Sequence, residues 1–374
     1  MLIGIDGNEA NLSTRVGVGQ YAFNLLWELY RQNKGDNYCV YLKQAPLLDL
    51  PPEKENWRYL VFGPKFLWTK FALPLRLLFS RPRPHFFYSP SHYSPSFSVV
   101  PTIPTIHDIG YLNYQDQFTK KDLYQLINWT KSSIGRAKHI VAVSSFTKNE
   151  LIKTYQIPPE KISVIYNGVS TPPGISAKTI EKVKKKFKIN SPYFLAVGTL
   201  KPNKNYPFLI KAFSTFLKSD SPQSLNYQLV IAGKKGWLFG EIEIVLKKLG
   251  LTHEVIFTDY ISEEEKWALY KGAISLVIPS TYEGFGIPAI ESQIVGTPVI
   301  ASNIPPLKEV LKDSALYIDP QNLNSLVAAF QKILDKDLRL KLIIKGKKQS
   351  AIFSWKKSAR ALSLLFHQIY PRHV

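Results

Sequence analysis

Short apolar runs alternate with amphipathic stretches from one end of the chain to the other. Apolar runs bounded by turn residues predict strands, and apolar residues that repeat at helical spacing predict helices. Because strands that alternate with helices form parallel sheets covered on both faces, the pattern predicts an α/β protein. We expect two Rossmann-like, doubly wound domains that face each other across a cleft.

The alternation can be followed element by element. In the first half, the predicted strands are residues 2–6, 38–42, 59–62, 86–88, 102–107, 140–143 and 162–166, and the clearest helices are 20–31, 120–136 and 145–155. In the second half, the predicted strands are 194–197, 229–232, 255–258, 275–278 and 299–301, and the helices are 206–217, 240–249, 263–271 and 288–295. Each half therefore has enough elements for a sheet of its own.

The domain boundaries are predicted from a break in this alternation. Residues 171–174 are rich in turn formers and the charged stretch 178–188 follows them, which together indicate a linker. A chain of 374 residues also exceeds what one hydrophobic core usually serves. We therefore expect domains at residues 1–172 and 173–354, and a final amphipathic helix at 355–374 that returns to the first domain.

The formal net charge of +20 implies attraction to an anionic partner. In segment 65–71, with Arg76, Arg81 and Arg83 after it, aromatic, aliphatic and basic side chains mix as they do in interfacial segments. This mixture predicts contact with an anionic membrane surface; the alternative is a buried helix broken by Pro74. No stretch is typical of a nucleic-acid-binding module, so no nucleic-acid partner is expected.

The compartment is predicted from two further features. No apolar run approaches the roughly 20 residues of a membrane span, and no signal peptide is visible after Met1. Cys39 is the single cysteine and cannot form an intramolecular disulfide. The expectation is a cytoplasmic protein, peripheral at the inner face of the membrane if the basic segment docks there.

Candidate ligand-binding residues lie beyond the carboxyl ends of the predicted strands, where doubly wound sheets bind ligands. Gly17 and Gly19 precede a helix and would let a ligand approach the backbone, although a plain turn explains them equally well. His107 and Asp108 end a strand, where a histidine is either structural or ligand-binding. Lys204, close to a helix N-terminus, suits a diphosphate leaving group or is a solvated surface residue.

The stretch from Pro279 to Glu291 is the most informative. Pro288 suits the first position of a helix, which leaves residues 284–286 in the preceding loop with amides available to phosphate or sugar oxygens. Glu283 precedes the glycines, and Glu291 is expected in the first helical turn. These carboxylates either complement the helix dipole or accept hydrogen bonds from hydroxyls at two ends of a sugar-containing ligand.

Taken together, the motifs resemble those of the retaining nucleotide-sugar glycosyltransferases with the two-Rossmann (GT-B) fold, the "glycosyl transferases group 1" class. The resemblance spans nearly the whole chain and is strongest over residues 194–320. The segments that carry it are 17–21, 106–108, 143–147, 165–169, 197–205 and 279–291, the last with the spacing E-x7-E.

The resemblance implies a role for each matching residue. His107 would lie near the transferred sugar, Lys204 on the phosphates and Glu283 on the sugar, and these three are the implied catalytic residues. Glu291 would hold the ribose. The implied donor-binding set is Gly17, Gly19, Gly198, Thr199, Lys204, Glu283, Gly284, Phe285, Gly286, Ile287 and Glu291.

One position departs from the family pattern. An arginine usually accompanies the phosphate-binding lysine, but here Gly198 is followed by Thr199. Lys204 would then carry more of the charge alone, or Arg136 or Lys201 would assist it.

The implied reaction is retaining transfer of a hexose from a UDP-glucose-type or GDP-mannose-type donor, with no cofactor and no metal. The acceptor would be a saccharide or a lipid-linked glycan in cell-envelope or exopolysaccharide biosynthesis. Three alternatives stay open: a sugar-nucleotide epimerase of the same fold, a DNA-glucosylating or nucleic-acid-binding protein, and a noncatalytic nucleotide-binding module.

Overall fold

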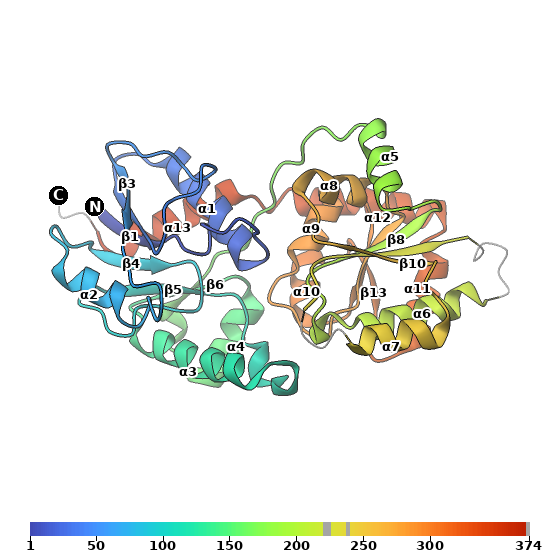
Figure 1. The fold of residues 1–374 in the computed structure, drawn as a ribbon, viewed down its shortest axis with the longest axis horizontal. Helices are drawn as coiled ribbons and strands as arrows, with labels where there is room; N and C mark the ends of the chain where they lie inside the picture. The colour runs from blue at the N-terminus through green and yellow to red at the C-terminus, as the bar shows by residue number, and fades with distance from the viewer. Residues whose placement is uncertain (220–225, 237–239, 372–374) are drawn as a thin grey trace. The chain divides into compact units, whose positions relative to one another are not determined.

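The computed structural model describes residues 1–219, 226–236 and 240–371. It divides the chain into two compact units, which we call unit 1 (Met1–Gly168 with Ser354–Val374) and unit 2 (Val169–Phe353) (Figure 1). Each unit contains one parallel sheet with helices around it. The division follows residue 168, where we expected it after residue 172.

Unit 1 is built on a seven-stranded sheet in the order β3-β2-β1-β4-β5-β6-β7, with neighbouring strands parallel. The strands are β1 (Leu2–Asp6), β2 (Asn37–Leu42), β3 (Trp57–Val61), β4 (Phe86–Ser89), β5 (Thr102–Ile106), β6 (Ile140–Ala142) and β7 (Ile162–Val164). The helices are α1 (Val18–Gln32), α2 (Ala72–Phe79), α3 (Lys120–Arg136) and α4 (Ser145–Tyr155). The strand order reverses between β1 and β4, so the loops that follow these strands diverge and leave room for a ligand.

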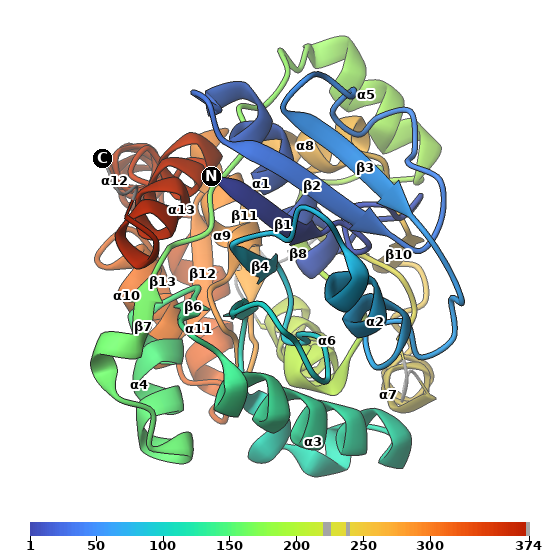
Figure 2. The same cartoon turned by 90° about the vertical axis from the view of Figure 1, so that its left-hand side faces the viewer.

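The last helix, α13 (Trp355–Ile369), belongs to unit 1 and lies beside α1 (Figure 2). The Trp355 ring packs edge-on against Tyr21, with 5.7 Å between the ring centroids. Gly168 permits a close backbone crossing, because a Cβ atom there would lie 2.0 Å from the Trp355 nitrogen. The final helix therefore packs where the amphipathic pattern placed it.

Unit 2 is built on a six-stranded parallel sheet in the order β10-β9-β8-β11-β12-β13. The strands are β8 (Tyr193–Val197), β9 (Gln228–Ala232), β10 (Val255–Asp259), β11 (Ser275–Ile278), β12 (Val299–Ser302) and β13 (Leu316–Ile318). The helices are α5 (Ala177–Lys186), α6 (Tyr206–Leu217), α7 (Gly240–Leu249), α8 (Glu263–Gly272), α9 (Ile287–Ile294), α10 (Pro305–Leu311), α11 (Leu323–Lys332) and α12 (Lys336–Ser350). Here the strand order reverses between β8 and β11.

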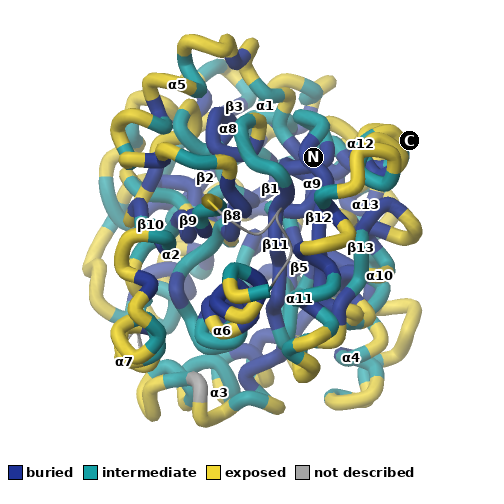
Figure 3. Tube along the Cα trace, turned by 90° about the vertical axis from the view of Figure 1, so that its right-hand side faces the viewer, coloured by how far each residue is buried: buried dark blue, intermediate teal, exposed yellow. Residues whose placement is uncertain are grey.

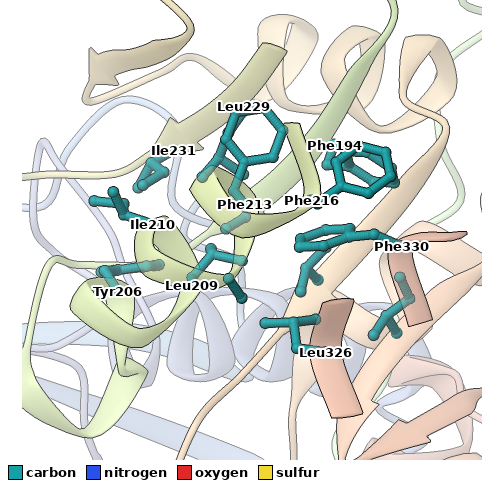
Figure 4. Close-up of a cluster of buried hydrophobic side chains, with 14 of the residues drawn as sticks. Phe194, Tyr206, Leu209, Ile210, Phe213, Phe216, Leu229, Ile231, Leu326 and Phe330 are labelled. Carbon is teal, nitrogen blue, oxygen red and sulfur yellow. The ribbon is translucent and has the colours of Figure 1, made fainter. Parts of the chain in front are cut away.

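The core of unit 2 is rich in aromatic residues (Figure 4). Phe194 of β8 meets Phe330 of α11 with 4.6 Å between ring centroids, and Phe213 and Phe216 of α6 are fully buried beside them. Burial concentrates on the strands, whereas α7 and α12 are largely exposed (Figure 3). A rigid, buried sheet thus fixes the positions at which the loops leave its carboxyl ends.

The charged stretch 178–188 was wrongly expected to be part of a linker, because most of it forms α5. Val183 is buried, and Ile180 packs so closely on α8 that a Cβ atom on Gly272 would lie 3.0 Å from its Cγ2 atom. The lysines occupy the solvent side of the helix. Their number concealed an apolar face that is sufficient to dock it.

Segment 65–71 is partly buried, and α2 differs from the helix broken at Pro74 that was one of the two expectations for this region. Trp68 is 4% exposed and anchors the segment in unit 1. Pro74 does not break a helix; it lies in the first turn of α2, where its missing N–H has no intrahelical partner to lose. The exposed apolar side chains of this region are Phe66, Phe71, Leu75 and Phe79.

Candidate active site

The candidate site in unit 2 lies at the reversal of strand order, where the loops after β8 and β11 leave the sheet. A small pocket at this edge is lined by residues of both loops and of the helices that follow them. The lining includes Val197, Lys204, Tyr206, Ser280, Glu283 and Pro288. Predicted donor-binding residues from two separate motifs therefore meet in one place.

Glycine is required where β8 ends. Gly198 has a φ of +150°, and a Cβ atom there would lie 3.4 Å from Lys204 Cε and from the Tyr206 hydroxyl. That hydroxyl donates to the Gly198 carbonyl oxygen at 3.1 Å. On the next strand, Gly233 packs against the same carbonyl, which lies 2.1 Å from the position of its would-be Cβ atom. Gly233 was missed from the sequence, although the glycine directly after a strand was its signal.

Lys204 and Glu283 form an ion pair at the centre of this site. The Lys204 Nζ atom lies 2.6 Å from Glu283 Oε1, and the side chains are 20% and 12% exposed. The Ser280 hydroxyl donates to the same carboxylate oxygen at 2.7 Å. In this state the two predicted catalytic charges neutralise each other, and each holds the other in a fixed position.

The two loops are also joined through Asn203. Its side-chain amide donates to the Tyr282 carbonyl at 3.2 Å, and its own carbonyl accepts from the Thr281 amide at 2.9 Å. Lys204 is therefore presented by a loop that is hydrogen-bonded to the loop carrying Glu283. Their proximity results from the backbone as well as from charge attraction.

Helix α9 begins at Ile287, so Pro288 is its second residue instead of its first. Gly286 precedes it with a φ of +92°, a left-handed conformation that favours glycine. Phe285 is 3% exposed and its ring packs against Phe353, so this side chain anchors the loop. At the start of the helix, the Ala289 amide donates to the Gly286 carbonyl at 3.0 Å and Pro288 has no N–H. The amides of Gly286 and Ile287 precede the first intrahelical acceptor and suit an anion.

Glu291 is the fifth residue of α9, so its expected place in the first turn was wrong. Its position makes a helix-dipole role less favourable, because that effect fades beyond the first turn. Instead, Lys266 Nζ lies 2.8 Å from one carboxylate oxygen, and the Tyr270 hydroxyl donates to the other at 2.9 Å. The carboxylate is thus held in one orientation, with lone pairs left for a ligand.

Lys266 and Tyr270 lie four residues apart on α8 and were missed from the sequence. Burial alone would lower the pKa of Lys266, but the Glu291 and Glu263 carboxylates outweigh burial and raise it. Burial, with Glu291 next, raises the pKa of Tyr270 well above its usual value, so its hydroxyl stays a donor. The i, i+4 spacing of these two residues can be read from the sequence, but their contact with Glu291 on another helix cannot.

In unit 1, Gly17 and Gly19 lie at the start of α1. Gly17 has a φ of +47° and open space where a Cβ atom would stand. Gly19 packs closely, since a Cβ atom there would be 3.1 Å from the Glu9 carbonyl. Gly17 therefore leaves the backbone accessible, whereas Gly19 serves close packing after β1.

His107 follows β5 and is held on three sides. Its Nε2 atom lies 2.9 Å from the Pro90 carbonyl, its ring meets the Tyr21 ring edge-on at 4.7 Å, and its backbone N–H donates to His92 Nε2 at 3.1 Å. Burial, with His92 second, lowers the pKa of His107 to about 4. The ring is therefore neutral, donates from Nε2 to Pro90, and carries its lone pair on Nδ1.

His92 was missed from the sequence. It follows β4 at the reversal of strand order in unit 1, and its ring stacks on His107 with 5.8 Å between centroids. Burial lowers the pKa of His92 to about 4. It lies in the loop between Pro90 and Pro95, which has no hydrophobic periodicity. Only the strand order of the sheet therefore indicates that His92 belongs to the site.

Arg136 does not lie with the candidate ligand-binding residues of unit 1. It lines a cavity of roughly 290 Å³ together with Pro101 and Thr102, which mark the amino end of β5. His107 follows the opposite end of that strand. Lys201, by contrast, lies in the loop that carries Lys204. Its carbonyl oxygen accepts a hydrogen bond from the Lys204 backbone N–H at 3.0 Å.

Among the residues that the structure describes, no group of three or more His, Cys, Asp or Glu side chains is arranged to hold a metal ion. No described helix combines the length and apolar character needed to cross a membrane.

Two family profiles match the chain. "Glycosyltransferase Family 4" matches residues 16–172, and "Glycosyl transferases group 1" matches residues 177–349. Together they cover most of both units. The chain therefore belongs to the GT-B glycosyltransferases of the glycosyl transferases group 1 family.

Named relatives agree with this family. The O-antigen chain mannosyltransferase RfbU of Salmonella typhimurium is 37% identical over 229 residues, which are 61% of this chain and 60% of that protein. The O-antigen chain mannosyltransferase B of Escherichia coli is 27% identical over 274 residues, or 72% and 71% of the two chains. Among solved structures, sucrose-phosphate synthase from Thermosynechococcus elongatus has a TM-score of 0.76 at 19% identity, covering 99% of both chains. The predicted two-Rossmann fold is confirmed.

Proposed function

We propose that this protein transfers a mannosyl group, with retention of anomeric configuration, from nucleoside-diphosphate mannose to a saccharide or lipid-linked acceptor of a cell-surface polysaccharide. The observation that carries the proposal is the ion pair of Lys204 and Glu283 at the strand-order reversal of unit 2. The similarity to two proteins named as O-antigen chain mannosyltransferases supports mannose over glucose as the transferred sugar. The proposed compartment is the cytoplasm, in keeping with the single cysteine.

In the proposed reaction the donor takes over both members of the ion pair. Lys204 turns to the diphosphate, and Glu283 is released to accept hydrogen bonds from sugar hydroxyls. The bond from the anomeric carbon to the diphosphate oxygen breaks, and its electron pair stays on the diphosphate. The acceptor hydroxyl oxygen bonds to the anomeric carbon on the same face, and its proton passes to the departing phosphate oxygen. The protein supplies position and charge.

The remaining residues are proposed to bind and orient. Glu291, fixed by Lys266 and Tyr270, would accept from the ribose hydroxyls. Amides at the start of α9 would meet phosphate or sugar oxygens. In unit 1, His107 would offer the Nδ1 lone pair to a hydroxyl, because its Nε2–H is committed to Pro90.

The proposal is tested with a panel of nucleoside-diphosphate sugars. A binding donor raises the melting temperature by mass action, and nuclear magnetic resonance of the product reports the anomeric configuration. Turnover without an acceptor that changes only the sugar would identify an epimerase instead. Binding without any turnover would identify a noncatalytic module, and no shift with any nucleotide sugar would remove the proposal.

We expect turnover to persist in excess chelator. The developing negative charge on the diphosphate is assigned to Lys204 and to helix amides, so no divalent ion is required for it. The measurement is the initial rate with and without EDTA after dialysis. If EDTA abolishes turnover and magnesium or manganese restores it, the charge is carried by a metal.

Replacing Tyr270 with phenylalanine should weaken free-nucleotide binding by about 3- to 10-fold, because one hydrogen bond that orients Glu291 is lost. Isothermal calorimetry with the free nucleotide measures it. The control is Tyr317→Phe, which also removes a hydrogen-bonded hydroxyl but one that donates to the Lys312 carbonyl. Equal affinity in both variants would show that Tyr270 does not position the ribose-binding group.

A further inference from the structure

One long segment of unit 1 contains basic residues and no acidic ones. Residues 56–107 contain no aspartate or glutamate, whereas they contain six basic residues. These are Arg58, Lys65, Lys70, Arg76, Arg81 and Arg83. A segment of this length with charges of one sign creates a positive electrostatic potential, which attracts an extended anionic surface.

Helix α2 lies within this segment and has two apolar faces. Ala72, Leu73 and Leu77 are buried in unit 1. On another side, Phe71, Leu75 and Phe79 follow one another at four-residue spacing and are 55%, 47% and 72% exposed. The first face holds the helix in the fold. The second forms an apolar stripe along the helix that is largely exposed.

Basic side chains flank this stripe. Arg76 is exposed beside Leu75. Arg81 donates to the Leu78 and Ser80 carbonyls, and Arg83 donates to the Leu78 carbonyl, so both guanidinium groups gather at the end of α2 next to Phe79. Within the part of the chain that the structure describes, none of these three arginines has a carboxylate partner.

We propose that this α2 face, defined as Phe71, Leu75, Phe79, Arg76, Arg81 and Arg83, docks unit 1 on an anionic lipid bilayer. The apolar stripe would enter the boundary between headgroups and acyl chains, and the arginines would contact lipid phosphates. The N-terminal end of α2 follows the loop after β3, at the carboxyl edge of the sheet that also carries His107. Docking therefore holds that edge near the surface where a lipid-linked acceptor would lie.

The chemistry of the α2 face favours a bilayer over two other occupants. A second copy would bring the same acid-free segment against itself, and like charges would repel. Nucleic acid would satisfy the arginines but would leave the Phe71, Leu75 and Phe79 stripe in water. An anionic lipid bilayer, in contrast to both, contacts the arginines through its headgroups and the apolar stripe through its acyl chains.

A rival surface exists on unit 2. Leu340 and Ile344 of α12 are 57% and 63% exposed at four-residue spacing, and lysines surround them. One of these lysines, Lys345, is paired with Asp313. The α12 residues therefore provide a control with similar apolar exposure on the other unit.

The test is flotation of the full chain with phosphatidylcholine vesicles that contain about 30% phosphatidylglycerol, an anionic content like that of a biological membrane surface. Vesicles of phosphatidylcholine alone are run beside them. Wild type should float with the anionic vesicles and be released by high salt. Arg76→Gln/Arg81→Gln/Arg83→Gln should bind about 100-fold more weakly, at about 5-fold for each charge near the surface. Leu75→Ser/Phe79→Ser should lose about 10-fold or more.

Two control variants separate the α2 face from bulk properties of the chain. Lys178→Gln/Lys182→Gln/Lys185→Gln on α5 removes the same charge, and Leu340→Ser/Ile344→Ser removes apolar exposure on α12; both should bind like wild type. Equal binding to neutral vesicles, or loss of binding in either control, overturns the proposal. A dimer that the α2 variants dissociate would show a second copy as the occupant. Because flotation needs no turnover, this outcome is independent of the catalytic proposal.

Discussion

Replacing Lys204 with methionine should lower kcat by about 10²- to 10³-fold, the cost of removing one preorganised charge from a transition state. Lys204 is the cation that the β8 loop presents beside Glu283, and methionine keeps much of its length without its charge. As the sugar separates, charge grows on the diphosphate, so the loss should be larger in kcat than in donor binding. Steady-state kinetics with saturating donor measures it.

The same substitution leaves Glu283 partly buried and without its cation, which should cost about 1 to 3 kcal/mol of unfolding free energy. A double variant, Lys204→Met/Glu283→Gln, removes the unpaired charge and should recover much of that stability while turnover stays low. Lys211→Met on the exposed side of α6 is the matched control and should behave like wild type. If the double variant recovers turnover together with stability, Lys204 has only a structural role.

Much of the fold was predictable because regular elements leave a local pattern. The helices Lys120–Arg136 and Tyr206–Leu217 were predicted with their observed bounds, because each has apolar residues at helical spacing between clear end signals. Helix α5 was not, because its lysines dominate the composition and its buried face is narrow. Charge describes the solvent side of a helix, and docking depends on the other side.

The site was predictable in its motifs and unpredictable in its pairings. Glu283 and Lys204 were each selected, but 79 positions separate them and nothing local indicates that they form an ion pair. Lys266 and Tyr270 were missed for the same reason, since their role depends on Glu291 on another helix. Sequence patterns report periodicity along one element, whereas these contacts depend on how strands are ordered in the sheet.

The second large effect separates the two glutamates of the E-x7-E motif. Glu291→Gln should weaken binding of both the donor and the free nucleotide by about 10- to 100-fold, the equivalent of roughly 1.5 to 3 kcal/mol for a hydrogen bond to a charged group. Glu283→Gln should spare free-nucleotide affinity or tighten it, because Lys204 is no longer held by a carboxylate. Its kcat should fall by about 10- to 100-fold, because the contact to the sugar matters most as the sugar leaves.

Calorimetry with free nucleotide and steady-state kinetics on both variants distinguish these outcomes. Glu264→Gln, an exposed first-turn acid of α8, is the matched control for loss of a carboxylate at a helix N-terminus. Were the two motif glutamates only helix-dipole acids, each substitution would cost at most about 1 kcal/mol of stability and leave kinetics like that of this control. Wild-type turnover in either motif variant removes that glutamate from the site. Equal loss of nucleotide affinity in both would place both carboxylates on the nucleotide and none on the sugar.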